Sequence, residues 1–147
     1  MQLFKKYDQG FVAGSFDIIH PGYISLFKEA KKYCNKLLVG LHHNPTIERK
    51  IKLPVINSLN DRKVILKSIK YIDNIITYKS ELDLYNILLN KNIHVRFLGN
   101  DYKGKKFTGS NLNIPIVWID RSHNFSATKI KKKIHKSIDK FLKTKND

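Results

Sequence analysis

Cysteine is nearly absent from this sequence, acidic residues are few, and long apolar runs are missing. Cys34 is the only cysteine in 147 residues, which excludes an internal disulfide and a cysteine-based metal site. No stretch approaches the roughly 20 apolar residues of a membrane span, and the first residues, 1–6, lack the apolar core of a secretory signal. We therefore expect a cytoplasmic protein with one domain over residues 1–147 and a core at about 10–142.

The scarcity of acidic residues gives the chain a strong positive charge. Lys and Arg number 28 against 12 Asp and Glu, for a formal net charge of +16, and such an excess is typical of nucleic-acid binding. However, only 4 of these cations are Arg, and 24 Lys occur beside 19 Ile and 13 Asn, as an AT-rich genome would produce. Arg is the better reader of bases and of bidentate phosphates. Nucleic acid is thus not the expected partner, although the field would attract a nucleoside triphosphate.

Short apolar runs alternate with helical patterns along the chain. The runs are typical of strands buried on both faces and lie at 10–16, 37–41, 74–78, 95–99 and 115–119. The helical patterns lie at about 22–34, 61–71, 81–91 and 126–142. Asn60 and Ser126 are candidate N-caps. This alternation predicts an α/β fold with an open, doubly wound sheet of five parallel strands.

The last predicted helix is amphipathic. Ile130, Ile134 and Ile138, with Phe141 or Leu142, form an apolar stripe, and lysines occupy the other faces. We expect the stripe to pack on the body with the basic side in solvent. A membrane-surface or nucleic-acid role for the basic face is a secondary possibility.

The segment Gly14–Tyr23 joins the first strand to the first helix. Pro21 suits a first helical position, and the helix start offers free backbone N–H groups and the positive end of the dipole to an anion. His20 adds a side-chain donor there, and Tyr23, one turn later, can face the same ligand. This junction predicts a phosphate site.

Polar residues follow the other predicted strands as well. His42-His43 end the second strand, Asn100-Asp101 follow the fourth, and residues 121–126 follow the fifth. In an open parallel sheet, ligands bind outside the carboxyl ends of the strands, so these groups converge on one edge with His20. Adjacent strand residues point to opposite faces, so the two histidines predict no metal site; one of them is expected to line an acceptor pocket.

The motif Gly-Ser-Phe-Asp-x-x-His-Pro-Gly-Tyr at 14–23 resembles the signature G-[TS]-F-D-x-x-H-x-G-H of cytidylyltransferase-like nucleotidyltransferases. Tyr23 stands where the family has its second histidine. Residues 120–130 resemble the later motif R-[ST]-E-x-I-S-[TS]-[TS], with His123 in place of the acidic residue. The segments 60–73 and 99–105 are similar to glycerol-3-phosphate cytidylyltransferases. The resemblance covers about residues 10–135.

The resemblance implies a site built from both ends of the chain. His20 would contact the triphosphate and stabilise the transition state, with Tyr23 beside it. Arg121 and one lysine, Lys52 or Lys50, would bind phosphates, and Arg62 would hold the triphosphate or the acceptor phosphate. The remaining residues implied to bind nucleotide are Gly14, Ser15, Phe16, Asp17, Gly22, Gly99, Asp101, Ser126 and Thr128. Asp17 could also orient neighbouring backbone or help hold Mg²⁺ through water.

The implied reaction is transfer of CMP from CTP to a polyol phosphate, with glycerol 3-phosphate favoured and pyrophosphate released. Mg²⁺ would neutralise the triphosphate, and family members are commonly homodimers. Heptose-phosphate adenylyltransferases and archaeal-type FAD synthetases resemble the same signature, so an adenylyltransferase acting on a sugar phosphate or FMN is an alternative. Tyr23 keeps a donor but cannot carry positive charge near neutral pH. A nucleotide-binding protein with impaired catalysis is therefore a second alternative, and a basic nucleic-acid binder a third.

Overall fold

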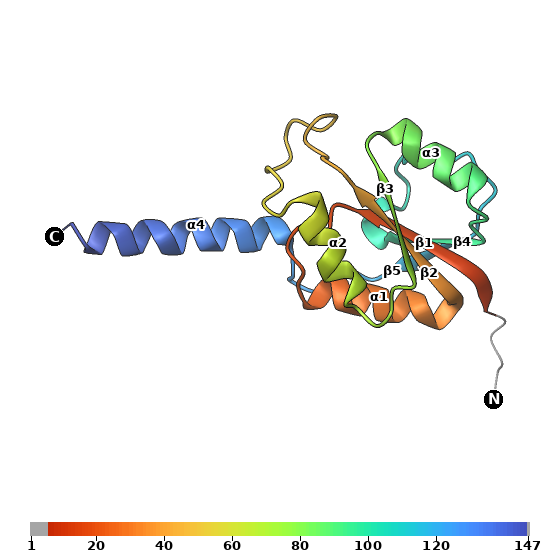
Figure 1. The fold of residues 1–147 in the computed structure, drawn as a ribbon, viewed down its shortest axis with the longest axis horizontal. Helices are drawn as coiled ribbons and strands as arrows, with labels where there is room; N and C mark the ends of the chain where they lie inside the picture. Colours follow the sequence, from red (N-terminus) through yellow and green to blue (C-terminus); the bar gives the residue numbers. More distant parts are fainter. Residues whose placement is uncertain (1–5, 147) are drawn as a thin grey trace.

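The computed structural model describes residues 6–146 (Figure 1). Over this range the strands are β1 (Tyr7–Gly14), β2 (Cys34–His42), β3 (Asn74–Tyr78), β4 (Val95–Gly99) and β5 (Ile116–Ile119). The helices are α1 (Pro21–Tyr33), α2 (Leu59–Lys67), α3 (Glu81–Asn90) and α4 (Ala127–Thr144), with one 3₁₀ turn, η1 (Asn100–Tyr102). The predicted strands and helices are all present, each within a few residues of its expected bounds.

All five strands run parallel, in the order β3-β2-β1-β4-β5. The expected α/β fold with a doubly wound parallel sheet is therefore confirmed. The order reverses between β1 and β4, which pair only at Gly10 with Val95 and at Phe11 with Arg96. Beyond these two pairs the strands diverge toward their carboxyl ends. In folds of this kind, the point where the order reverses is where ligands bind.

Apolar side chains fill both faces of the sheet because successive residues of a buried strand point in opposite directions. On one face, Phe27 and Ala30 of α1 and Leu66 of α2 pack against Val39 and Phe97. On the other, the helix α3 covers the sheet. The buried residues of that second layer are Phe11, Leu38, Tyr78, Leu84, Ile87, Leu88 and Ile93.

The ends of the helices correct one prediction and confirm another. Ser58, not Asn60, caps α2, and its hydroxyl accepts a hydrogen bond from the Asp61 N–H at 3.1 Å. Asn60 already lies inside α2, which ends at Lys67 rather than at 71. Ser126 caps α4 as predicted, accepting from the Lys129 N–H at 3.4 Å.

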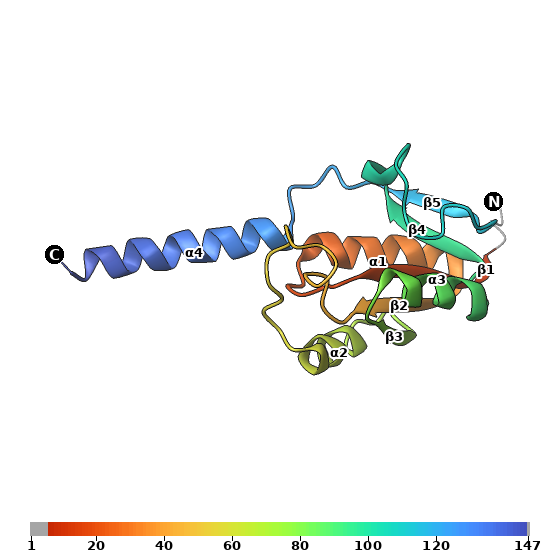
Figure 2. The same ribbon diagram turned by 90° about the horizontal axis from the view of Figure 1, so that it is seen from above.

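The helix α4 does not pack as the sequence predicted. It begins beside the sheet edge and projects away from the rest of the molecule (Figures 1 and 2). No residue of α4 is buried, and Ile134, Ile138, Phe141 and Leu142 are 49–59% exposed. The prediction of a packed stripe was wrong because amphipathicity identifies an apolar face without identifying what covers it. Over residues 6–146, no helix is both long and apolar enough to cross a membrane.

Candidate active site

A cavity of about 630 Å³ opens at the carboxyl ends of the strands, where β1 and β4 diverge. The β1–α1 junction lines it through Gly14, Ser15, Phe16, His20, Gly22 and Tyr23. Its other walls include His42 at the end of β2, Gly99 at the end of β4, and Arg121 after β5. Of the groups expected at this edge, His20, His42 and Arg121 therefore do converge on the cavity. His43, Asn100 and Asp101 line neither this cavity nor the smaller one beside it.

His20 stands at the N-terminus of α1 as its N-cap residue, without a capping hydrogen bond from its side chain. The ring is 6% exposed and stacks on Tyr23, with ring centroids 4.0 Å apart. Burial lowers the pKa of His20, and the nearby positive groups His123 and Arg121 lower it further. Among residues 6–146, His20 Nδ1 is the buried side-chain atom that lacks a hydrogen-bond partner. A buried polar atom without a partner in a cavity wall is suited to bind a ligand.

Tyr23 is a neutral neighbour of His20. Burial raises the pKa of its phenol, so it remains a hydrogen-bond donor at neutral pH. Its ring also meets Phe16 edge-on, with centroids 5.1 Å apart. Phe16 has φ of 44°, in the left-handed region that side chains rarely adopt, which marks a tight turn between strand and helix. At Gly22 a side chain would collide with the His123 ring, so glycine allows that ring to approach α1.

A second cavity, of about 180 Å³, adjoins the first at the start of α4. Lys52, Arg121 and Lys131 line it together with His20 and Tyr23, and the first turn of α4 closes it with Ser126 and Thr128. Cationic side chains and a helix N-terminus are the groups that bind phosphate in proteins. Of the two lysines that the sequence left open, Lys52 lines both cavities and Lys50 lines neither.

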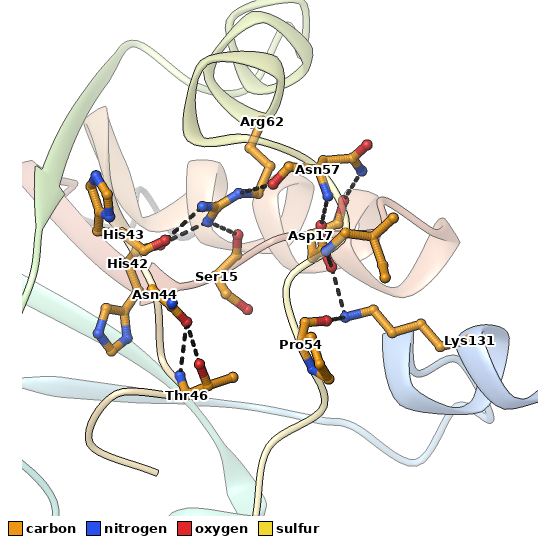
Figure 3. A network of polar contacts seen from close by, with 11 residues as sticks. Ser15, Asp17, His42, His43, Asn44, Thr46, Pro54, Asn57, Arg62 and Lys131 are labelled. Atoms are coloured by element: carbon orange, nitrogen blue, oxygen red, sulfur yellow. Dashed lines mark hydrogen bonds and ion pairs between the residues drawn. The ribbon is translucent and has the colours of Figure 1, made fainter. Parts of the chain in front are cut away.

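Asp17 ties the loop that carries Lys52 to α4 (Figure 3). Its carboxylate is 2% exposed and accepts from the N–H groups of Ile56, at 2.7 Å, and Asn57, at 2.8 Å. Lys131 forms an ion pair with it at 2.6 Å and donates to the Pro54 carbonyl at 2.9 Å. Burial would raise the pKa of Asp17, but these donors together hold it below its ordinary value. Asp17 therefore orients backbone, as one sequence-based interpretation had it, and Lys131 is a site residue that the sequence analysis missed.

Arg62 has a different role from the one implied by resemblance. Its guanidinium is 2% exposed and donates to the main-chain carbonyls of Ser15, His42, His43 and Asn57, at 2.7–3.1 Å (Figure 3). These four bonds occupy most of its five N–H donors. It lines neither cavity. Contact with phosphate does not fit this geometry, because the side chain instead fastens the ends of β1 and β2 to α2.

Asp101 also lies outside both cavity walls. It forms an exposed ion pair with Arg121, with 3.7 Å between Arg121 Nη1 and Asp101 Oδ1. Gly99 lies under this pair, where a side chain would collide with both partners. Asp101 is thus placed to orient Arg121 at the cavity rather than to line the cavity itself.

The α3 side of the cavity holds one residue that the sequence predicted for an acceptor pocket, His42, and one that it did not, Arg96. His42 is 5% exposed and stacks on Tyr78, with centroids 4.6 Å apart, and burial lowers its pKa. Arg96 is 4% exposed and also faces this cavity, beside Glu81. The sequence did hold a signal for Arg96, because it is the one charged residue in the apolar run that forms β4. Within residues 6–146, no group of three His, Cys, Asp or Glu side chains is placed to hold a metal ion.

Comparison with known proteins agrees with this architecture. The model of the cytidylyltransferase-like family matches residues 11–138. The chain belongs to that family. Among curated relatives, the glycerol-3-phosphate cytidylyltransferase of Bacillus subtilis is 32% identical over 121 residues, which cover 82% of this chain and 92% of the relative. The family match and this coverage confirm the resemblance first indicated by the two end motifs.

Other relatives of this chain have different names. The bifunctional protein HldE of Wolinella succinogenes is 31% identical over 86% of this chain, but the match spans only 27% of that longer protein. The FAD synthase of Thermococcus sibiricus is 27% identical over 93% of this chain and 97% of its own length. A solved lipopolysaccharide core biosynthesis protein of Thermoplasma volcanium superposes with a TM-score of 0.63 at 27% identity, covering 76% of this chain and 95% of that one. The family is thus a nucleotidyltransferase family with varied substrates.

Proposed function

We propose that this protein transfers CMP from CTP to a polyol phosphate in the cytoplasm, with glycerol 3-phosphate favoured, and releases pyrophosphate. The observation that carries the proposal is the unpartnered Nδ1 of His20, which lies where the helix start of α1 meets a cavity lined by Lys52, Arg121 and Lys131. Two relatives match over nearly their whole length, and the higher identity of the glycerol-3-phosphate cytidylyltransferase, 32% against 27% for the FAD synthase, supports CTP and glycerol 3-phosphate.

The chemistry requires no protein nucleophile. A phosphate oxygen of the acceptor attacks the α-phosphorus of the triphosphate in line, the bond from that phosphorus to the bridging oxygen breaks, and pyrophosphate leaves. The protein positions the partners and stabilises charge on the transferring group. His20 supplies a donor at the α-phosphate, and Lys52 and Arg121 of the smaller cavity hold the β- and γ-phosphates, while Lys131 stays paired with Asp17. Loss of one preorganised donor such as His20 should raise the barrier by about 3–4 kcal/mol.

Mg²⁺ was expected to accompany the triphosphate. Asp17, the carboxylate nearest the phosphate cavity, is already held by two N–H groups and Lys131, and the described residues form no cluster of metal ligands. Residues 6–146 therefore offer no fitting set of protein ligands for the ion. We assign no step to a metal held by the protein, and Mg²⁺ enters the assays as the counter-ion of the nucleotide.

Two alternatives have specific support. An adenylyltransferase is favoured by the relatives named FAD synthase and HldE. A nucleotide-binding protein with impaired catalysis is favoured by Tyr23, whose half-buried phenol supplies no positive charge where the family signature has histidine. Use of ATP instead of CTP would distinguish the adenylyltransferase from the proposed enzyme. Binding of a triphosphate without turnover would distinguish the protein with impaired catalysis.

We also propose a homodimer, with α4 as part of its interface. The half-exposed apolar stripe of α4 and the exposed Ile47, Ile51 and Ile56 of the loop after β2 are two uncovered apolar surfaces of the same chain. In a two-fold dimer each contact occurs twice, because a patch that touches a second patch of the partner is in turn matched by the reverse contact. The α4 stripe of each copy can therefore cover the loop of the other. The second copy would then lie next to the loop that holds Lys52.

The decisive experiment is Mg²⁺-dependent pyrophosphate release from CTP and from ATP, each with a panel of polyol and sugar phosphates. We expect turnover of CTP with glycerol 3-phosphate and a loss of a hundredfold or more in His20→Ala. Turnover of ATP alone would establish the adenylyltransferase. Triphosphate binding without turnover on any acceptor would establish impaired catalysis, and salt-sensitive DNA or RNA binding that survives His20→Ala would establish the nucleic-acid binder.

A further inference from the structure

Two arginines are almost fully buried in this protein, and their surroundings differ. Arg62 is saturated by four main-chain carbonyls. Arg96, on β4, donates one hydrogen bond, from Nη1 to the Thr108 carbonyl at 2.7 Å, and forms no ion pair with a described carboxylate. Arg96 lines the large cavity, and none of its nitrogens is both fully buried and without a hydrogen-bond partner. The nitrogens that do not bind Thr108 are therefore accessible from the cavity. The guanidinium therefore presents spare donors to the cavity.

The carboxylate nearest to Arg96 is already engaged by other groups. Glu81 is the neighbouring carboxylate, and its two oxygens are engaged by Arg49, at 3.1 Å, and by the Thr108 hydroxyl. Burial lowers the pKa of Arg96 to about 10, and Glu81 only partly opposes this effect. Burying a charge without a partner is unfavourable, whereas a guanidinium fork matches a carboxylate or a phosphate. The guanidinium also lies over the Phe107 ring, 5.4 Å from its centroid, but this contact uses none of its N–H donors. The partner that these donors still lack is thus an anion.

The position of Arg96 relates this missing anion to the reaction. Phe11 and Arg96 form the last pair before β1 and β4 diverge, and the same cavity is lined by His20 and Tyr23 on the α1 side and by His42 and Arg96 toward α3. The triphosphate groups of the proposed reaction lie at the α1 side, next to the start of α4. The lobe toward α3 lies outside this phosphate site and offers room for the second substrate.

We infer that Arg96 binds an oxyanion of the acceptor substrate, in the lobe of the cavity between β4 and α3. The inference rests on the proposed function and adds a specificity-determining residue to it. The oxyanion is either the reacting phosphate of the acceptor or a second acidic group at its far end. A purely structural role, fastening the loop after β4 through the Thr108 carbonyl, would use one donor and leave the fork unexplained.

The test compares wild type with Arg96→Lys, which keeps the charge and loses the fork, and with Arg96→Met. Lys67→Met, on the exposed end of α2, is the matched control for loss of one positive charge. Two acceptors of equal carbon number, glycerol 3-phosphate and 3-phosphoglycerate, differ in whether the far end is neutral or acidic. The KM for each acceptor and for CTP is measured, with circular dichroism to verify folding.

A rise in the acceptor KM of about ten- to a hundredfold in Arg96→Lys, with the KM for CTP unchanged, is expected for a lost charge-assisted pair. If the rise occurs with both acceptors, the oxyanion is the reacting phosphate; if it occurs only with 3-phosphoglycerate, it is the far group. Acceptor KM values within twofold of wild type in both variants would overturn the inference. Equal rises in the KM for CTP and the KM for the acceptor would also overturn it.

A binding measurement separates this inference from the proposed function. If no acceptor supports turnover, the proposed function fails, and calorimetric titration of the same two phosphate esters into wild type and Arg96→Lys still decides the role of Arg96. A tenfold weaker binding to the variant supports the inference. Equal binding to both proteins, or none to wild type, refutes it.

Discussion

Replacement of Arg62 by Met distinguishes a structural role from a phosphate-binding role. The guanidinium bonds four carbonyls, of which the His42 carbonyl is the fully buried partner and the other three are partly accessible. At about 2 kcal/mol for the buried bond and about 1 kcal/mol for each of the others, the change should cost about 5 kcal/mol of unfolding free energy. Domains of this size have about 5–15 kcal/mol in total, so the loss would be severe.

The assay is urea unfolding followed by circular dichroism, at a fixed pH near 7. Because Arg62→Met could leave too little folded protein, Arg62→Lys serves as a second variant: it keeps the charge, reaches fewer carbonyls and should lose about half as much. Arg49→Met is the control, since its exposed pair with Glu81 should contribute less than about 1 kcal/mol. If Arg62→Met unfolds within about 1 kcal/mol of wild type but has a raised KM for CTP, Arg62 binds phosphate and the structural reasoning is refuted.

Three further predictions concern the site, its ionisation and α4. Tyr23→His should keep or raise the rate of pyrophosphate release, and a loss above tenfold would instead show a specialised use of the phenol. Burial lowers the pKa of His20 and His42 below the ordinary value of about 6.5, so on acidification the unfolded chain binds protons before the folded protein does. The free energy of unfolding should therefore fall from pH 7 toward pH 5. Urea titrations should show a smaller fall for His42→Gln. Ile134→Asp should convert the proposed dimer to monomer in sedimentation equilibrium, while Lys136→Asp on the opposite face should not.

The fold was predictable because the relevant signals are local. Each buried strand is a short apolar run, and Ser126 precedes its helix at the spacing that a cap requires. The edge where His20 and Arg121 meet also followed from the sequence, since parallel strands place their carboxyl ends together. That step requires only that the strands are parallel, and neither their order nor the positions of individual side chains.

The remaining features depend on contacts between distant segments. Arg62 occupies a helix start that reads as exposed, and only the carbonyls of Ser15 and His42, far away in the sequence, show that it is buried. Lys131 resembles the other lysines of α4 until Asp17 is placed beside it. The sequence correctly identified the apolar stripe of α4, but the periodicity of a helix does not show which surface covers its apolar face.

The ion pair between Asp17 and Lys131 sets a practical boundary for truncating this protein. Lys131 lies in the first turns of α4, and the helix continues to Thr144, about 20 Å further along its axis. A chain cut just after residue 132 would retain the lysine that neutralises Asp17 while discarding Ile134, Ile138 and Phe141. If α4 forms the proposed dimer interface, a stop codon after residue 132 would remove that interface and keep the ion pair at Asp17. A cut before Lys131 would also remove the cation that pairs with Asp17 beside the Lys52 loop.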